Sequence, residues 1–171
     1  MAALAFTHID TFIGPLLLAG DDTALRFVLF AENGKPAKPR HDWLPDGAPL
    51  GEAVAQLHAW FAGELLDFNL PLAFAGNRLQ EAVWQGMCAI PYGETVSYGA
   101  LARAIGEDVS ASRAVGAACG ANPLPVVIPC HRVIGADGSL TGFGGGLALK
   151  RALLAHERKI RPLPGQQLAL F

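Results

Sequence analysis

The spacing of hydrophobic residues changes along the chain and predicts its elements. Two apolar stretches, 14–20 and 24–30, flank a turn-forming Asp-Asp-Thr sequence, which is typical of a strand pair. The polar, proline-rich segment 32–49 is expected to form a loop. Residues 52–61 then place apolar side chains at helical spacing. The first part of the chain is therefore expected to combine strands with a helix.

The periodic pattern breaks at Pro71 and Gly76, and we place a domain boundary there. The expected organisation is an N-terminal α/β domain at residues 1–76, a C-terminal domain at residues 77–160 and a tail at residues 161–171. A chain of 171 residues has room for two small domains of this kind.

The second half begins with another helical pattern, at residues 79–90, and continues with two shorter helices. Ser97 can cap the first of these, at residues 98–105, because its hydroxyl can accept a hydrogen bond from the first turn. Ser110 or Ser112 can cap the second in the same way. Two short helices at this spacing are typical of a helix-turn-helix, although two packed core helices give the same pattern.

The second short helix consists almost entirely of small residues, with one arginine, Arg113, near its start. It ends at Asn122-Pro123, because proline disfavours a helical residue before it. Its glycines, Gly116 and Gly120, each cost a helix about 1 kcal/mol relative to alanine. A close approach to a DNA groove, with contacts to sugar and phosphate, would explain them. A buried alanine-rich helix is the alternative.

The net charge of −2 is unevenly distributed. Residues 1–97 contain five basic and eleven acidic residues, a net charge of −6, whereas residues 98–161 contain eight basic and four acidic residues, a net charge of +4. A polyanion is therefore expected to bind the second half. The chain lacks the ~18–20 residue apolar run of a membrane span, and its start lacks the pattern of a signal peptide. We therefore expect a soluble cytoplasmic protein without membrane contacts.

The three cysteines follow no CxxC or disulfide pattern, so they predict neither a zinc site nor a disulfide framework. Cys130 differs from the others because it follows an apolar run, 126–128, that is typical of a buried strand, and precedes His131 and Arg132. This electropositive setting is expected to lower the pKa of the thiol and favour a nucleophilic thiolate. A buried structural thiol is the alternative. The other two cysteines lie on predicted helices and are expected to be inert.

A glycine-rich segment, 142–146, contains one aromatic residue, Phe143. The glycines allow a ligand to approach the backbone closely and Phe143 offers a stacking face, although a flexible hairpin would have the same composition. An amphipathic helix follows at residues 147–156, with Lys150 and Arg151 expected on its exposed face.

Together, these residues resemble the O6-alkylguanine-DNA alkyltransferases, also called methylated-DNA–protein-cysteine methyltransferases. The resemblance is densest over residues 79–157 and weaker over residues 1–75, where residues 9–16 match the family's opening strand. Its most specific part is Pro-Cys-His-Arg-Val at residues 129–133, after a helix-turn-helix that ends in Asn-Pro. The other matching pieces are Val83-Trp84, Ile90-Pro91-Tyr92-Gly93, Ser97-Tyr98-Gly99, Arg113-Ala114-Val115-Gly116, the glycine-rich segment, Lys150, Leu153-Leu154 and Glu157.

The resemblance implies an α/β (α+β) fold. A small antiparallel N-terminal sheet with a helix, ribonuclease-H-like in type, is expected to precede a helical C-terminal domain with a winged helix-turn-helix. It also implies direct DNA repair, in which an alkyl group moves from O6-alkylguanine, and by extension O4-alkylthymine, to Cys130 once per molecule. Such a single-turnover S-methyltransferase is expected to need no cofactor and no metal.

In this family the helix-turn-helix binds the minor groove of double-stranded DNA with little sequence preference, and the damaged nucleotide is flipped out. By resemblance, Arg113 fills the space of the flipped base, and Tyr98 assists flipping at the neighbouring phosphate. The further positions implied in DNA binding are Gln80, Ala114, Gly116 and Ala117.

By the same resemblance, Cys130 attacks the alkyl carbon, His131 acts as a base through a water molecule, and Glu157 orients His131. Tyr98 donates a proton to the leaving guanine, and Asn122 links the recognition helix to the active-site segment. The substrate pocket is expected to be lined by Pro125, Val133, Phe143 and Gly144.

The chain departs from the family pattern in several places. Leu79 stands where the family has phenylalanine, and Phe143 stands where tyrosine is common. The turn 107–112 looks longer than usual and carries two acids, which is expected to weaken its DNA contact. No cysteine precedes Cys88, so the N-terminal zinc site of some relatives is not expected.

The chain ends in Gln-Leu-Ala-Leu-Phe, which resembles the short peptides by which bacterial DNA enzymes dock onto the sliding clamp. Folding of the tail onto its own domain is the alternative. We therefore expect a monomer whose partners are double-stranded DNA and, through Gln167–Phe171, a sliding clamp.

Two other functions fit parts of the pattern. A catalytically silent sensor of DNA damage would have the same fold, but such relatives lack the cysteine that is present here as Cys130. A Cys–His hydrolase would need an oxyanion hole, for which the sequence offers no support beyond the adjacent Cys130 and His131.

Overall fold

The structure is a computed structural model, and it describes residues 3–162. The chain divides into two compact units, Met1–Phe74 and Ala75–Phe171. The division follows Phe74, whereas the sequence places the boundary after Gly76. The expected clamp-binding peptide, Gln167–Phe171, lies outside the described residues.

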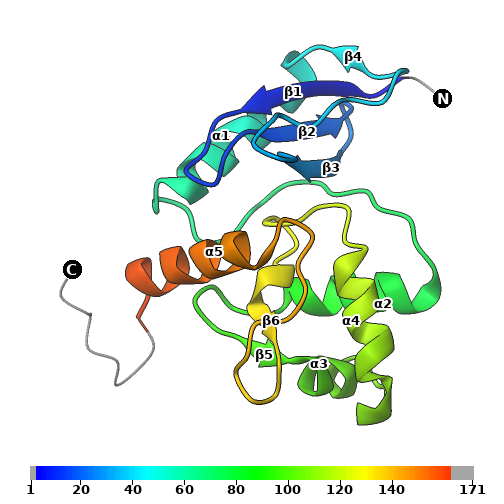
Figure 1. The fold of residues 1–171 in the computed structure, drawn as a ribbon. Coiled ribbons are helices and arrows are strands. Elements are labelled where there is room, and N and C mark those ends of the chain that lie inside the picture. Colours follow the sequence, from blue (N-terminus) through cyan, green and yellow to red (C-terminus); the bar gives the residue numbers. More distant parts are fainter. Residues whose placement is uncertain (1–2, 163–171) are drawn as a thin grey trace. The chain divides into compact units, whose positions relative to one another are not determined.

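The first unit contains a four-stranded sheet with the order β3-β2-β1-β4 (Figure 1). Its first three strands are antiparallel neighbours, and β4 pairs with β1 in parallel. The segment 32–49, expected to be a loop, contains this short edge strand and the start of a 3-10 helix. The elements are β1 Ala5–Ile9, β2 Leu16–Gly20, β3 Leu25–Phe30, β4 Leu44–Pro45, η1 Ala48–Leu50 and α1 Gly51–Phe61.

β2 is buried over its whole length. Leu17 and Ala19 pack with Ala37 and Trp43, which come from the segment before β4. The alternate residues of β2 point to the opposite face of the sheet, and η1 contacts both β1 and β2. A central strand covered on both faces is apolar at consecutive positions, and this explains the unbroken apolar sequence of β2.

The prediction of an opening strand at residues 9–16 is wrong. β1 ends at Ile9, and Thr11 then forms a turn. The Thr11 hydroxyl donates to the Gly14 carbonyl (2.7 Å) and accepts from the Ile13 amide (3.2 Å). Gly14 has a φ of 102°, a conformation that glycine adopts without steric cost. This turn separates β1 from β2 and lets them pair.

The second unit is mainly helical. α4 packs against both α2 and α3, and the parallel strands β5 and β6 lie beside α3 (Figure 1). α5 contacts the short helix η3. The elements are α2 Arg78–Cys88, β5 Val96–Ser97, α3 Tyr98–Ala104, η2 Val109–Ala111, α4 Ser112–Gly120, η3 Cys130–Arg132, β6 Val133–Ile134 and α5 Leu147–Ile160.

The two helices of the helix-turn-helix begin differently. Ser97 caps α3 as expected, and its hydroxyl accepts from a first-turn amide at 3.0 Å. Neither Ser110 nor Ser112 caps α4, so that prediction is wrong. Instead, Asp108 accepts from the Ser110 amide (2.8 Å) and starts η2, which continues directly into α4. One of the two acids in this turn therefore has a structural role.

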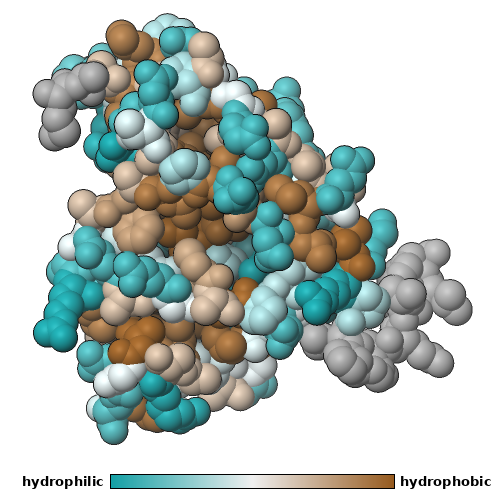
Figure 2. All heavy atoms as spheres, turned by 180° about the vertical axis from the view of Figure 1, so that it is seen from behind, coloured by the Kyte–Doolittle hydropathy of each residue, from teal (hydrophilic) through white to brown (hydrophobic). Residues whose placement is uncertain are grey.

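Hydrophobic and hydrophilic residues are interspersed on the face seen in Figure 2. No helix within residues 3–162 is long and apolar enough to cross a membrane. Single exposed hydrophobic residues are normal on protein surfaces. In the described part of the chain, the large ones are Phe12, Leu44, Val109, Leu147 and Ile160.

We predict that Asn77→Ala lowers the free energy of unfolding by about 1 kcal/mol. Asn77 caps α2, because its side chain accepts from the Gln80 amide (2.8 Å) while the Gln80 side chain accepts from the Asn77 amide (3.0 Å). Urea denaturation followed by circular dichroism measures the change. Asn77→Asp is the matched control, because it keeps the accepting oxygen. Equal losses in the two variants would contradict the capping role.

Candidate active site

Cys130 begins the short helix η3 and follows a tight turn. The preceding residues 126–128, expected to be a buried strand, are buried but form no strand, so the prediction of their conformation is wrong. Val126 has a φ of 74°, which is rare for a β-branched residue and incompatible with a strand. Three prolines between residues 123 and 129 also lack the amide hydrogens that a central strand donates.

The side chain of Asn122 closes this turn. Its Nδ2 donates to the Ile128 carbonyl (2.8 Å), and its Oδ1 accepts from the Leu124 amide (2.9 Å). A backbone bond from the Ile128 amide to the Leu124 carbonyl (2.8 Å) lies inside the same turn. Because Asn122 comes just after α4, its side chain ties the end of that helix to the segment that carries Cys130.

The Cys130 thiol is buried, with 7% of the residue exposed. Burial raises the pKa of this thiol, against smaller lowering effects from a hydrogen bond with Asn122 and from the positive charge of Lys150. The expected lowering of the Cys130 pKa is therefore wrong for the protein without DNA. A thiol that stays protonated at neutral pH needs a base before it can act as a nucleophile.

Lys150 is buried in α5, with 1% of the residue exposed, so its expected position on the outer face of the helix is wrong. Its ammonium donates to the carbonyls of Val133 (2.6 Å) and Thr141 (3.3 Å). These bonds replace part of the hydration that the ammonium loses on burial. The neighbouring Arg151 is exposed, as expected.

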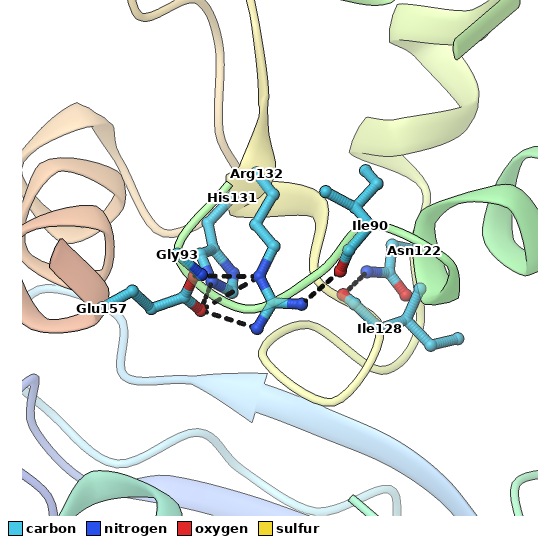
Figure 3. A network of polar contacts seen from close by, with 7 residues as sticks. All are labelled: Ile90, Gly93, Asn122, Ile128, His131, Arg132 and Glu157. Carbon is cyan, nitrogen blue, oxygen red and sulfur yellow. Dashed lines mark hydrogen bonds and ion pairs between the residues drawn. The ribbon is translucent and has the colours of Figure 1, made fainter. Parts of the chain in front are cut away.

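A buried carboxylate, Glu157 of α5, joins three segments of the chain (Figure 3). Its Oε2 lies 2.6 Å from His131 Nε2, and its Oε1 accepts from the Gly93 amide at 3.0 Å. Arg132 donates to the same carboxylate through Nε (2.9 and 3.1 Å) and Nη2 (2.8 Å). The Arg132 Nη1 donates to the Ile90 carbonyl at 2.7 Å. Both carboxylate oxygens therefore accept several hydrogen bonds.

Arg132 balances the charge of Glu157 and is not directed to the thiol, in contrast to the electropositive setting expected from the sequence. Burial acts to raise the pKa of Glu157, but the hydrogen bond and charge of His131 and the contacts of Arg132 outweigh it and lower the pKa to about 2. Burial lowers the pKa of His131, against the raising effect of Glu157. At neutral pH the pair is therefore a carboxylate and a neutral imidazole whose Nε2–H donates to it.

Tyr98, the first residue of α3, lies where several segments meet. The Thr141 hydroxyl donates to the Tyr98 hydroxyl at 2.8 Å. A β-carbon at Gly116 of α4 would lie 3.7 Å from the Tyr98 ring, an ordinary van der Waals contact, so the two helices lie close together here. The Lys150 ammonium lies 5.8 Å from the ring centroid. Burial raises the pKa of Tyr98, against the lowering effect of the Thr141 hydrogen bond.

One face of α4 presents the residues that resemblance assigns to DNA. Arg113, Ala114 and Ala117 are exposed, and Gly116 is half-buried. α4 is therefore not a wholly buried alanine-rich helix. Its opposite face is buried and consists of Val115, Ala118 and Cys119.

The remaining predicted site residues have mixed surroundings. Pro125 and Val133 are buried, Phe143 is half-buried and Gly144 is exposed. Gln80, expected to contact DNA, is half-buried and takes part in the cap of α2.

The other two cysteines differ from Cys130 in their settings. Cys88 is exposed at the end of α2. Cys119 is buried on α4, and burial raises its pKa to about 12. Within residues 3–162, no three His, Cys, Asp or Glu side chains are grouped so that they could hold a metal ion.

Sequence reasoning missed the structural roles of Arg132 and Thr141. A signal for Arg132 existed, because a glutamate on the buried side of an amphipathic helix needs a cationic or hydrogen-bonding partner. No local pattern marks Thr141, whose contact with Tyr98 spans 43 positions in the sequence.

Comparison with protein families assigns both units. The model described as 6-O-methylguanine DNA methyltransferase, ribonuclease-like domain, matches residues 4–74, and that of the DNA binding domain of the same family matches residues 78–159. The methylated-DNA–protein-cysteine methyltransferase of Mycobacterium tuberculosis is 48% identical over 157 residues, which cover 92% of this chain and 94% of the relative. The protein of that name from Methanosarcina acetivorans is 47% identical over 145 residues, which cover 85% and 92%.

Solved structures share the fold. The crystal structure of M. tuberculosis OGT in complex with DNA has a TM-score of 0.85 and 47% identity, and covers 91% of this chain and 94% of that chain. The O6-methylguanine-DNA methyltransferase from the archaeon Pyrococcus kodakaraensis has a TM-score of 0.60 at 21% identity, and covers 90% and 98%.

The predicted fold class is confirmed: a small sheet with a helix precedes a helical C-terminal unit, as in these structures. The fold and the two matched family models define a protein of the DNA alkyltransferase class. The chain belongs to the methylated-DNA–protein-cysteine methyltransferase family.

We predict that Glu157→Gln lowers the free energy of unfolding at neutral pH by about 3 kcal/mol or more, because Arg132 is left buried without its counter-charge. The pKa of Glu157 is lowered to about 2 from an ordinary value of 4.5. Its carboxylate therefore stabilises the fold fully above pH ~4.5, and this contribution is lost as the pH falls toward 2. Chemical denaturation across this range should show the difference between wild type and variant shrinking.

Glu64→Gln is the control for this experiment, because Glu64 is an exposed glutamate in the other unit. A stability difference between wild type and Glu157→Gln that stays constant with pH would contradict the role assigned to the carboxylate.

Proposed function

We propose that this protein repairs alkylated DNA by transferring an alkyl group from O6-alkylguanine, and also from O4-alkylthymine, to Cys130. The observation that carries the proposal is a buried thiol in the same short helix as His131, which pairs with Glu157. Relatives covering most of the chain carry the name methylated-DNA–protein-cysteine methyltransferase. Each molecule acts once, because the thioether formed on Cys130 is chemically stable.

His131 serves as the base for a thiol that burial keeps protonated. The neutral imidazole takes the Cys130 proton through a water molecule, and the Glu157 carboxylate stabilises the imidazolium that forms. The sulfur then attacks the alkyl carbon, and the bond between that carbon and the guanine oxygen breaks, leaving its electron pair on the base. Tyr98 donates a proton to the guanine. The nucleophile and the acid–base groups are all side chains, so the step needs neither cofactor nor metal.

DNA binds through the minor groove to the exposed face of α4, with little sequence preference. Small residues on this face permit a close approach of the backbone to sugar and phosphate, and the second half of the chain has a net positive charge. Arg113 is exposed at the start of α4 and fills the space of the flipped nucleotide. Flipping costs a few kcal/mol and less for a poorly paired, damaged base, which favours the damaged substrate.

We predict that duplex DNA carrying radiolabelled O6-methylguanine transfers about one label per protein molecule, and that Cys130→Ser abolishes the transfer. Cys88→Ser is the matched control and should keep full transfer, because Cys88 is exposed at the end of α2. Denaturing gels after incubation with excess DNA measure the label on the protein.

Other outcomes have distinct meanings. Transfer that survives Cys130→Ser contradicts the assigned acceptor. Release of free label over many turnovers would identify a hydrolase, and binding to damaged DNA without transfer would identify a silent damage sensor.

The C-terminal residues Gln167–Phe171 dock onto a sliding clamp, and the protein otherwise acts as a cytoplasmic monomer. The sequence supports docking, because a glutamine can hydrogen-bond while leucine and phenylalanine fill an apolar site.

We predict that deletion of Gln167–Phe171 abolishes retention of the protein on immobilised clamp, while alkyl transfer persists. A variant with the same five residues in scrambled order is the control for composition. Equal retention of the full and the deleted chain would sink the docking proposal.

A further inference from the structure

Thr141 directly precedes the glycine-rich segment 142–146 and forms a side-chain hydrogen bond with Tyr98. Its hydroxyl donates to the Tyr98 hydroxyl at 2.8 Å. Its carbonyl accepts from the Lys150 ammonium at 3.3 Å, and that ammonium is fixed by the Val133 carbonyl at 2.6 Å. The hydrogen bond from Lys150 therefore fixes the main chain of Thr141, and the side chain of Thr141 fixes the Tyr98 hydroxyl.

The surroundings of this contact restrict the position of the Tyr98 ring. The Lys150 ammonium lies 5.8 Å from the Tyr98 ring centroid and 5.9 Å from that of Phe143. A cation at these distances is attracted to the faces of both rings. On the α4 side, a β-carbon at Gly116 would already be in contact with the Tyr98 ring. These contacts involve the ring of Tyr98, whereas its hydroxyl is contacted by Thr141.

The hydrogen bond between the two hydroxyls has a chemical consequence. Only Thr141 can donate in this pair once Tyr98 has given up its proton, because a phenolate oxygen is an acceptor only. A donor to the phenol oxygen also stabilises the phenolate that remains after Tyr98 gives up this proton.

We propose that Thr141 is a positioning residue for alkyl transfer, which holds the Tyr98 hydroxyl in place and strengthens it as the proton donor to the leaving guanine. This inference rests on the proposed function, in which Tyr98 has that role. The proton balance is closed: the Cys130 proton leaves through His131, the guanine gains the Tyr98 proton, and the phenolate regains one from solvent as the repaired base departs. Thr141 itself neither gains nor loses a proton.

The test uses the two tyrosines of the chain, Tyr92 and Tyr98, as spectroscopic probes. Tyrosinate absorbance is titrated with pH in wild type, and Tyr98→Phe assigns the transition that belongs to Tyr98. Burial raises the pKa of Tyr92 to about 12, and the titration of Tyr98→Phe records the Tyr92 transition by itself. The titration is evaluated only over the pH range in which the circular dichroism signal of the folded protein is retained.

Thr141→Val keeps the shape of the side chain and removes the hydroxyl. We expect it to raise the pKa of Tyr98, and to slow single-turnover transfer at saturating DNA about fivefold, as for the loss of one hydrogen bond. Thr141→Ser should restore both. Ser139→Ala is the matched control. It also removes a hydroxyl, two residues before Thr141, but that hydroxyl bonds to Asp137 and not to Tyr98.

If the pKa of Tyr98 is unchanged in Thr141→Val, the inference is overturned. Slower transfer alone does not support it, because a merely structural defect would also slow transfer. Failure of Thr141→Ser to restore the titration and the rate also overturns it. If wild type transfers no label, the proposed function fails, and with it the catalytic meaning of the contact. A normal wild-type rate that is unchanged in Thr141→Val leaves the proposed function standing and overturns the inference alone.

Discussion

The C-terminal unit depends on one buried charge, the carboxylate of Glu157. A lone carboxylate in such a place would be costly, and here the Arg132 guanidinium, the His131 ring and the Gly93 amide share its two oxygens. The same contacts join α5, η3 and the loop after α2, so the stability of the unit and the tautomer of His131 have a common origin. The His131 ring beside Cys130 is therefore oriented by a carboxylate whose removal would leave Arg132 buried without its counter-charge.

The thiol itself is held in a resting state by the same packing. Burial raises the pKa of Cys130, so reactivity depends on removal of its proton and not on a thiolate that exists beforehand. The segment before it is fixed by Asn122 and includes Val126 with a positive φ, a backbone conformation that persists only where surrounding contacts enforce it. Burial also protects this thiol, because stray oxidation or alkylation favours the exposed thiolate.

Local sequence patterns predicted the elements well where one face of a helix or strand dominates. The helix at residues 52–61 and the capped helix after Ser97 were found from spacing and caps. Local patterns gave wrong predictions where several local rules compete. Residues 126–128 have the composition of a strand, but the prolines around them remove the hydrogen bonds that a strand requires. Lys150 has the charge of a surface residue, but backbone carbonyls distant in sequence receive its ammonium.

The sequence by itself determined the helix pair and the family, and it singled out Cys130, His131 and Glu157 as candidates, because these depend on short patterns with few alternatives. Only the tertiary structure decided which partner each charge meets. Arg132 faces Glu157 and not the thiol, Lys150 points inward, and Thr141 reaches Tyr98 across 43 positions. The physical reason is that hydrogen bonds and ion pairs act over a few ångströms in space, whereas the sequence orders residues only along the chain. Burial then sets the protonation of Cys130 and His131, and burial is a property of the packed fold.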